Sequence, residues 1–362
     1  SQEESPMAEL VAGESYVVLQ DSGSTPAEDG GGSRFAVADD PRPVAQPGVP
    51  LRMALPMVTK GGLVGAMFVD VAGSEQYFSQ RWLNILVGIA GQAAIAVENN
   101  RLLGEAAEQE RMKQELDFAR RIQASFLPDR APKVPGWELA TIWRPARQVG
   151  GDFFDFVPLA PGTAKLGGGS ERVGLVIADV ADKGVPAALY MALSRTLVRT
   201  VAIDGRPPGE ALARANDLIL ADARSHLFVT LLYAIVEPGT GLVRYANAGH
   251  MPPLLVRASD GGLEELQEHG MALGVLSGME YQELTHQLAP GDTLVLYTDG
   301  VTDASNLEQE MFGRERLVDL VSECQGLPAA SLAEAISTAV ADFVGDAPQF
   351  DDLTLLVAKR VQ

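Results

Sequence analysis

Four short apolar runs of this chain begin or end beside an aspartate, and no other feature constrains its fold as strongly. The runs are "GGDFFD" (150–155), "VIADV" (176–180), "LVLYTDG" (294–300) and "FDDLTLLV" (350–357). Short, continuous apolar runs bounded by turn residues indicate buried strands. Because strand ends are rigid, carboxylates at several of them can converge on one point, as hard oxygen-binding cations such as Mg²⁺ or Mn²⁺ require. The sequence therefore predicts a sheet protein with acidic strand ends.

Each aspartate has a simpler interpretation when it is taken alone. An aspartate beside a glycine ordinarily serves turn chemistry, and one before a helix ordinarily caps it. Residues 172–201 predict a buried strand, an Asp-Lys-Gly turn and a long helix, in which Asp182 is better placed than Asp179 to be the cap. Four such aspartates along one chain favour a shared site over four separate turns.

The first hundred residues predict a different kind of structure. Residues 21–50 are rich in Gly, Pro, Ser and Asp and predict a loop. Residues 51–71 contain two β-type apolar runs about Lys60-Gly61-Gly62, which is typical of a hairpin. From Ser79 to Pro128 the apolar residues recur at helical spacing. Within this helical segment, the apolar run "ILVGIAGQAAIAV" (85–97) is shorter than the roughly 18 to 20 residues of a membrane span and predicts a buried helix.

The second half of this helix carries a narrow apolar stripe among charged residues. The stripe consists of Leu102, Ala106, Met112, Leu116, Ala119 and Ile122. A stripe that narrow indicates a coiled-coil seam or signalling linker whose partner helix comes from a second protomer. The alternative is a helix packed on its own domain.

Charge and cysteine content narrow the classes of partner. The 362 residues carry a formal charge of −20, which repels nucleic acid and anionic membrane surfaces, so we expect protein or small-molecule partners. The single Cys324 cannot form an intramolecular disulfide, which fits a reducing cytoplasm. The sequence thus predicts a cytoplasmic protein that binds neither nucleic acid nor membranes.

Six motifs in order resemble the bacterial branch of the metal-dependent PPM protein phosphatases, which contains the sporulation stage II E and stress-response sigma-regulator phosphatases. They are "FARRIQASFLP", "RPARQVGGDFFD", "VIADVADKGVPAAL", "FVTLLYAIVEPGTGLVRYANAGH", "LVLYTDGVTDA" and "FDDLTLLV". The resemblance implies an α+β fold, an α-β-β-α sandwich of two antiparallel sheets flanked by helices, with two Mn²⁺ or Mg²⁺ ions at one end of the sheets. It also implies a phosphoserine or phosphothreonine substrate, typically on a small anti-sigma-factor antagonist protein of the STAS type.

The same resemblance implies roles for individual residues. Asp152 and Asp179 match the metal-bridging carboxylates, and Asp299 and Asp351 match the other metal ligands, so that these four are the catalytic set. Because Asp352 stands beside Asp351, it is the alternative ligand, although the family's Asp-Asn form favours Asp351.

Two further roles follow from the family pattern, and a third, for His250, follows from the chemistry of the leaving group. A backbone carbonyl should also bind metal, and both Val180 and Gly184 are candidates for it. Arg147 matches a phosphate-binding arginine of some members, with pairing to the acidic cleft as the alternative. His250 is a candidate acid for the leaving serine oxygen, with a structural turn histidine as the alternative. For Asp155 two interpretations remain: it supports the metal ligands from behind, or it lies on the protein surface.

The hairpin at 51–71 followed by "GSEQYFSQRWLNILVGIAGQAAIAVENNRLL" resembles the C-terminal half of a GAF sensor domain. We therefore expect a GAF-like, possibly truncated sensor or dimerisation domain at 1–100, a coiled-coil-like linker at 101–128 and the phosphatase domain at 129–362. A homodimer through the linker and the GAF-like domain is expected.

Two other functions compete with a phosphatase. The Gly-Gly-Asp turn also occurs in cyclases that make cyclic dinucleotides, but Phe153-Phe154 stands where a cyclase has Glu. The second alternative is a metal-free pseudophosphatase that serves as a signalling scaffold, which the intact aspartates disfavour.

Overall fold

The computed structural model describes residues 17–21, 35–37, 51–71, 80–159, 172–222, 226–267 and 270–361. The chain divides into two compact units, Ser1–Lys113 and Gln114–Gln362, and one helix runs through the boundary between them. A helix that could cross a membrane, with the length and sustained apolar character this needs, is absent from the described residues.

The first unit contains a four-stranded antiparallel sheet in the order β2-β1-β3-β4. Its strands are β1 (Val17–Asp21), β2 (Phe35–Val37), β3 (Leu51–Thr59) and β4 (Gly62–Val71). The predicted hairpin is confirmed as β3 and β4, and Gly62 in its turn has a φ of 115°, which glycine adopts without strain. Strand β2 corrects the loop expected over 21–50, because pairing with β1 orders three residues too short to show a period. The rest of that predicted loop lies outside the described residues.

Helix α2 (Gln80–Phe126) confirms the long helix and corrects its expected burial. Leu83, Ala90 and Ala94 are buried, and the first two belong to a small core with Met53 and Leu55 of β3. Ile85, Ile89 and Ile95 nevertheless remain 44%, 50% and 50% exposed. A single sheet covers one face of a helix, so the segment 85–97 is half buried and not a fully buried helix.

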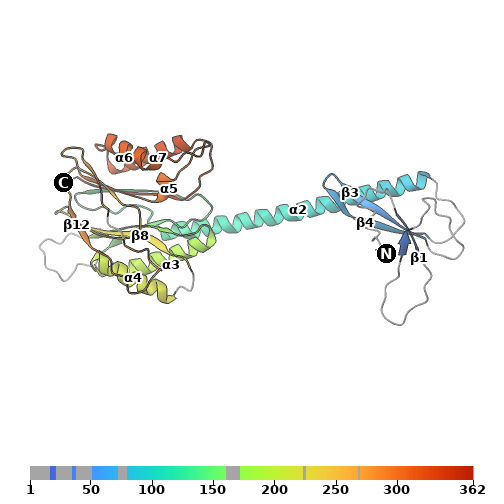
Figure 1. The fold of residues 1–362 in the computed structure, drawn as a ribbon, viewed down its shortest axis with the longest axis horizontal. Helices are drawn as coiled ribbons and strands as arrows, with labels where there is room; N and C mark the ends of the chain where they lie inside the picture. Colours follow the sequence, from blue (N-terminus) through green and yellow to red (C-terminus); the bar gives the residue numbers. More distant parts are fainter. Residues whose placement is uncertain are drawn as a thin grey trace. The chain divides into compact units, whose positions relative to one another are not determined.

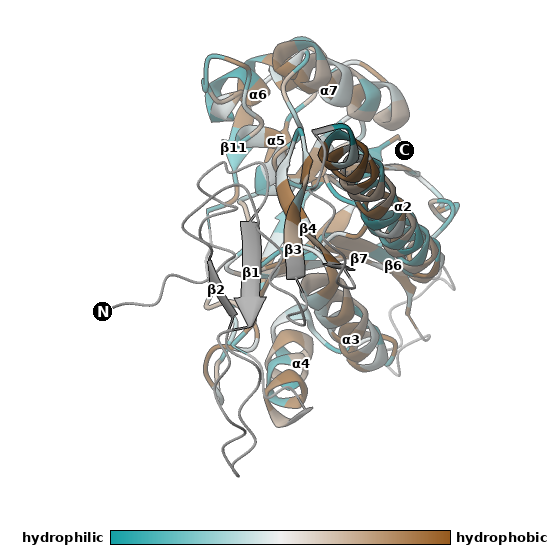
Figure 2. Ribbon diagram, turned by 90° about the vertical axis from the view of Figure 1, so that its right-hand side faces the viewer, coloured by the Kyte–Doolittle hydropathy of each residue, from teal (hydrophilic) through white to brown (hydrophobic). Residues whose placement is uncertain are grey.

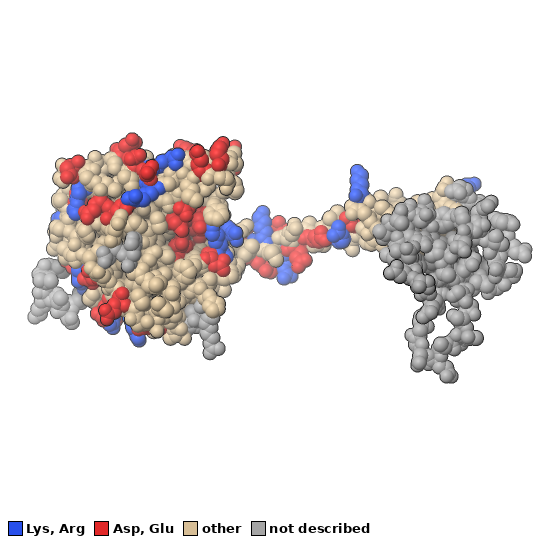
Figure 3. All heavy atoms as spheres, in the orientation of Figure 1, with Lys and Arg blue, Asp and Glu red and all other residues tan. Residues whose placement is uncertain are grey.

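The second half of α2 is charged and largely exposed, and Figure 3 shows side chains of both signs following each other along it. Within the predicted stripe, Leu116 and Ala119 are half-buried, whereas Leu102 and Met112 are 49% and 62% exposed. A partner helix for this stripe remains a prediction.

The second unit is built on two five-stranded sheets whose neighbouring strands are all antiparallel. The first sheet has the order β11 (Leu263–Glu265), β10 (Leu254–Val256), β13 (Thr293–Tyr297), β14 (Leu353–Arg360) and β5 (Trp137–Arg144). The second sheet has the order β12 (Leu284–Gln287), β9 (Leu242–Ala248), β8 (Val229–Val236), β7 (Val173–Val180) and β6 (Phe153–Pro158).

Helices cover the outer face of each sheet. Helices α3 (Val185–Ala202) and α4 (Pro208–Asp222) pack on the second sheet. Helix α7 (Ala329–Val344) packs on β5 and β14 of the first, and α6 (Gly313–Glu323) packs beside it. Figure 1 shows the resulting four layers, and Figure 2 shows hydrophobic stretches in both α3 and α7. The predicted α-β-β-α sandwich is confirmed.

Two cores hold the layers together. Phe153, Leu231 and Leu356 are buried in the core that the second sheet shares with the inner face of the first. Val295, Leu317 and Ile336 are buried in the core between the first sheet and its helices. Each fully buried side chain of this size contributes roughly 1.5 to 3 kcal/mol. Strands fixed on both faces have rigid ends, and these ends carry the acidic residues.

Candidate metal centre

The second sheet supplies two aspartates at one of its edges. Asp152 directly precedes β6, and Asp179 lies near the end of β7. The two strands are antiparallel with Phe153 opposite Ala178, so the start of one lies beside the end of the other. Antiparallel pairing therefore brings Asp152 and Asp179 together although they are well separated in the sequence.

The first sheet supplies the other two by the same arrangement. Asp299 follows β13 and begins the short helix α5 (Asp299–Thr302), while Asp351 lies just before β14. Tyr297 pairs with Leu355, which places these two strand ends next to each other. Thr298, beside Asp299, and Thr354, three residues after Asp351, both donate hydrogen bonds to Asp152, so the acidic strand ends of the two sheets lie together.

Burial and mutual repulsion raise the pKa of three of these carboxyls. Burial, then the charges of Asp179 and Asp352, raises the pKa of Asp152 well above its usual range. Burial, then Asp299, raises the pKa of Asp179 to about 7. Burial, then Asp351, raises the pKa of Asp299. Carboxylates that disfavour one another's ionised form make a site that a divalent cation would stabilise.

Two threonines orient Asp152. The Oγ1 atoms of Thr298 and Thr354 each donate a hydrogen bond of 2.7 Å to Oδ2 of Asp152, and both hydroxyls are buried. The backbone N–H of Thr354 in turn donates to Thr298 Oγ1 at 3.1 Å. Sequence reasoning gave these threonines no role, although they adjoin the acidic motifs "YTDG" and "FDDLT".

Asp352 holds the loop that carries Asp152. Its Oδ1 accepts the N–H of Ala146 at 2.8 Å, and its Oδ2 accepts the N–H of Gly151 at 2.7 Å. Gly150 permits this approach, because a Cβ on it would lie 2.1 Å from Asp352 Oδ2. With both oxygens committed to the backbone, Asp352 fits an anchoring role better than that of a ligand.

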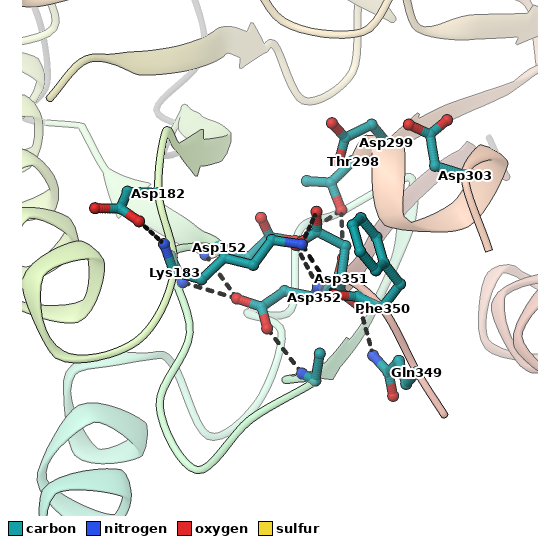
Figure 4. A network of polar contacts seen from close by, with 12 residues as sticks. Asp152, Asp182, Lys183, Thr298, Asp299, Asp303, Gln349, Phe350, Asp351 and Asp352 are labelled. Carbon is teal, nitrogen blue, oxygen red and sulfur yellow. Dashed lines mark hydrogen bonds and ion pairs between the residues drawn. The ribbon is translucent and has the colours of Figure 1, made fainter. Parts of the chain in front are cut away.

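Lys183 stands directly against Asp351. Figure 4 shows its ammonium group reaching Oδ2 of Asp351, at 2.8 Å, and the carbonyl of Phe350, at 2.9 Å. The same Nζ lies 3.8 Å from the centroid of the Phe350 ring, within the range of a cation–π contact. Its charge also acts to lower the pKa of Asp299. The positively charged side chain of Lys183 thus lies among the acidic residues.

The turn before Lys183 is unusual in its backbone. Asp182 has a φ of 93°, a conformation that residues other than glycine rarely adopt. Its Oδ1 accepts the N–H of Lys183 at 2.7 Å, a local bond that aspartate can make in such turns. Asp182 therefore shapes the turn that delivers Lys183, and the structure shows no side-chain bond from it to the start of α3.

Helix α2 contributes a residue that sequence reasoning missed. Nε2 of Gln123 donates to the carbonyl of Gly150 at 2.5 Å, and Oε1 of Gln123 accepts the N–H of Gly150 at 3.1 Å. Gln123 is 3% exposed, so this reciprocal pair is shielded from water. The only sequence signal was its place in "FARRIQASFLP", and the bond connects α2 to the Gly-Gly-Asp loop.

The donor set fits hard divalent cations, because Asp152, Asp179, Asp299 and Asp351 offer only oxygen. Over the residues that the structure describes, no three Asp, Glu, His or Cys side chains already stand in an ion-holding arrangement. In the structure, Oδ2 of Asp351 contacts Lys183, and Oδ2 of Asp152 accepts hydrogen bonds from its two threonines.

The structure distinguishes the two candidate carbonyl ligands. The carbonyl of Gly184 accepts the N–H of Ala188 at 3.0 Å and is thereby part of helix α3. The carbonyl of Val180 instead faces Gly151, since a Cβ on Gly151 would lie 2.9 Å from it. Val180 is therefore the better candidate.

The remaining two predicted residues, Arg147 and His250, differ in their exposure. Arg147 is exposed in the loop before Asp152. His250 is 3% exposed, its Nδ1 lies 3.0 Å from Thr230 Oγ1, and burial lowers its pKa to about 3. A buried, neutral imidazole cannot deliver a proton to a protein substrate at neutral pH, so the structure supports the structural alternative for His250.

Asp155 is neither at the surface nor among the ligands. It is 1% exposed, and Arg195 and Arg199 of α3 reach its carboxylate at 3.0 and 2.8 Å. Three positions after Asp152, its side chain faces helix α3. Asp155 therefore attaches α3 to β6.

Comparisons with known proteins identify the second unit. Residues 169–361 match the model of the family described as Stage II sporulation protein E (SpoIIE). The phosphoserine phosphatase RsbU of Bacillus subtilis is 28% identical over 252 residues, which cover 70% of this chain and 72% of RsbU. The SiaA-PP2C domain of Pseudomonas aeruginosa matches with a TM-score of 0.61 and 27% identity, over 71% of this chain and 100% of that domain.

A longer relative is matched only in part. Protein IcfG of Synechocystis sp. is 28% identical over 303 residues, which are 76% of this chain but 46% of IcfG. The chain therefore spans about half the length of that relative.

Proposed function

The chain belongs to the SpoIIE family, and from this premise we propose that it is a metal-dependent phosphatase of phosphoserine and phosphothreonine in proteins. The observation that carries the proposal is the convergence of Asp152 and Asp179 from one sheet with Asp299 and Asp351 from the other. The phosphoserine activity in the name of RsbU supports it.

Two divalent cations, Mn²⁺ or Mg²⁺, would supply charge neutralisation of the phosphoryl group and a more acidic water for in-line attack. The protein's part is to hold the ligands. Thr298 and Thr354 fix one oxygen of Asp152, so that its other oxygen faces the cluster. Asp352 and Gln123 fix the loop on which Asp152 lies. Arg147, exposed on that loop, is our candidate for binding the substrate phosphate.

We propose a small anti-sigma-factor antagonist phosphoprotein of the STAS type as the substrate. The similarity to RsbU supports a role in signalling of this kind. An intact protein reaches the carboxylates only if they lie near the surface, and the Asp351 side chain is 29% exposed. Dephosphorylation in a lysate, followed by identification of the phosphoprotein that loses its phosphate, would test this substrate.

We also propose that the chain dimerises through α2 and the GAF-like unit, which would act as a sensor. The exposed apolar residues of the stripe support this, since two copies would bury them against each other. Met112→Lys should weaken self-association of the full chain in sedimentation equilibrium. Ala107→Lys adds the same charge at another exposed position of the helix and should leave self-association unchanged.

The enzymatic proposal is tested with p-nitrophenyl phosphate and added Mn²⁺. We expect hydrolysis that Asp179→Ala abolishes, together with weaker Mn²⁺ binding in titration calorimetry. A folded chain that hydrolyses neither this compound nor any phosphopeptide would favour the pseudophosphatase scaffold instead. In that case, unchanged Mn²⁺ binding in Asp179→Ala would also remove Asp179 from the ligand set.

A further inference from the structure

A small cavity opens beside the acidic cluster, between the end of helix α7 and the loop that leads to β14. Its volume is about 160 Å³, and its walls include Val340 and Val344 of α7, Ala304 after α5, and Pro348 and Phe350 of the loop. Asp351 and Gly300 also line it. Because Gly300 directly follows Asp299, the cavity shares a wall with the candidate metal centre.

The cavity has the size of one side chain. Sites for drug-sized ligands occupy about 300 to 1,000 Å³, whereas a cavity of about 150 Å³ accommodates a benzene-sized group. Most of its wall residues are apolar, while Arg144, Gln349 and Asp351 add polar groups. The apolar part of the wall matches a leucine-like or aromatic side chain.

The walls are held in place by the chain itself. Nε2 of Gln349 donates to the carbonyl of Arg144 at 2.9 Å and to that of Asp351 at 2.7 Å, which ties the loop to the end of β5. The ring of Phe350 is braced by the ammonium group of Lys183. The cavity is therefore formed before any ligand arrives, as is usual for binding sites.

The cavity also contains a polar group without a partner. Ser337 of α7 lines it and is fully buried, and its hydroxyl has no hydrogen-bond partner among the described residues. An unpaired buried hydroxyl is costly and uncommon. Because this hydroxyl is sealed from solvent, it belongs to the wall behind the cavity and would not contact an apolar side chain bound there.

We propose that this cavity is a specificity pocket that receives one apolar side chain of the phosphoprotein, a few residues from the phosphoserine. The inference rests on the proposed phosphatase function. It is argued from the shared wall: Asp351 belongs both to the candidate metal centre and to the lining of the cavity, so a peptide whose phosphate lies at Asp351 would have its neighbouring residues beside the cavity. The exposed Arg144 at the rim would contact the peptide backbone or an acidic neighbour.

The test uses the full chain with Mn²⁺ and two sets of phosphoserine peptides that differ by Leu or Ala at one flanking position at a time. We expect one position at which Leu raises kcat/KM by at least about tenfold, the usual worth of an apolar group in a pocket. Ala341→Leu fills the cavity and should abolish this preference, so that Leu and Ala peptides are hydrolysed with the same kcat/KM. Ala330→Leu makes the same change at an exposed position of α7 outside the cavity and should retain the preference.

Four outcomes would overturn the inference, and a fifth would overturn the proposed function on which it rests. A wild-type chain without a Leu preference at any position, or an Ala341→Leu variant that keeps it, removes the pocket from substrate recognition. An Ala341→Leu variant that hydrolyses Ala peptides faster than the wild type would show that a segment of this chain, and not the substrate, occupies the cavity in the wild type. If p-nitrophenyl phosphate is hydrolysed but no peptide is, the pocket inference fails while the phosphatase activity stands. If neither is hydrolysed, the proposed function itself fails.

Discussion

The ammonium group of Lys183 lies 2.8 Å from Oδ2 of Asp351, the aspartate best placed as a ligand at the end of the first sheet. A cation tethered at this point offsets part of the acidic repulsion, as its effect on Asp299 shows. We expect a metal ion held by Asp351 to compete with Lys183 for this carboxylate.

Lys183→Met should bind Mn²⁺ more tightly, by about tenfold in Kd, because loss of a charge-assisted bond of this kind is worth about 1.5 kcal/mol or more. Titration calorimetry of the full chain measures it directly. Lys133→Met, at an exposed position away from the carboxylates, controls for the change in net charge. Weaker binding in Lys183→Met would mean instead that Lys183 orders Asp351 for the metal.

Substitution of Asp351 and substitution of Asp352 should have different effects on stability and on metal binding. Asp352→Ala leaves the N–H groups of Ala146 and Gly151 unpaired, so we expect about 1 to 3 kcal/mol of lost stability in denaturant unfolding without metal. Asp351→Ala removes one repelling carboxylate and should leave metal-free stability nearly unchanged while weakening Mn²⁺ binding. Equal destabilisation by both substitutions would contradict this division of roles.

Gln123→Leu should loosen the loop that carries Asp152. The change removes both bonds to Gly150 from a buried position, and the amide of Gly150 should then exchange its hydrogen faster. Hydrolysis of p-nitrophenyl phosphate should fall as Asp152 loses its position. Ser125→Ala removes an exposed hydroxyl two residues away and serves as the control. Unchanged exchange at Gly150 would show that other contacts hold the loop.

His250 should make the second unit less stable in mild acid. Burial lowers its pKa from 6.5 to about 3, so between these values the unfolded chain binds a proton that the folded chain does not. The free energy of unfolding should therefore fall as the pH decreases from 7 to 5, by about 2 kcal/mol from this group. His250→Asn should flatten this part of the pH profile. The raised pKa of Asp179 acts in the opposite direction over this range, so the difference between the two profiles is the test: a difference between wild type and His250→Asn that stays constant from pH 7 to 5 would refute the assignment.

Much of the fold was predictable because it depends on local patterns. The hairpin at 51–71, the helix that became α2 and the strands before and after the acidic motifs each show their own period or turn residues. Strand β2 and the half-burial of 85–97 were not predictable in this way, since each depends on which other segment packs against it.

The sequence by itself determined the family and singled out the four aspartates as candidate ligands, with Asp351 favoured over Asp352, because order and spacing along the chain suffice to recognise the motifs. Only the tertiary structure showed that Asp352 holds the Gly-Gly-Asp loop, gave Asp155 its arginines and brought Lys183 and Gln123 to the acidic loops. These outcomes depend on contacts between residues far apart in the chain. Two adjacent aspartates look alike in a sequence, but the fold turns one to the backbone of a distant loop and leaves the other to meet a cation.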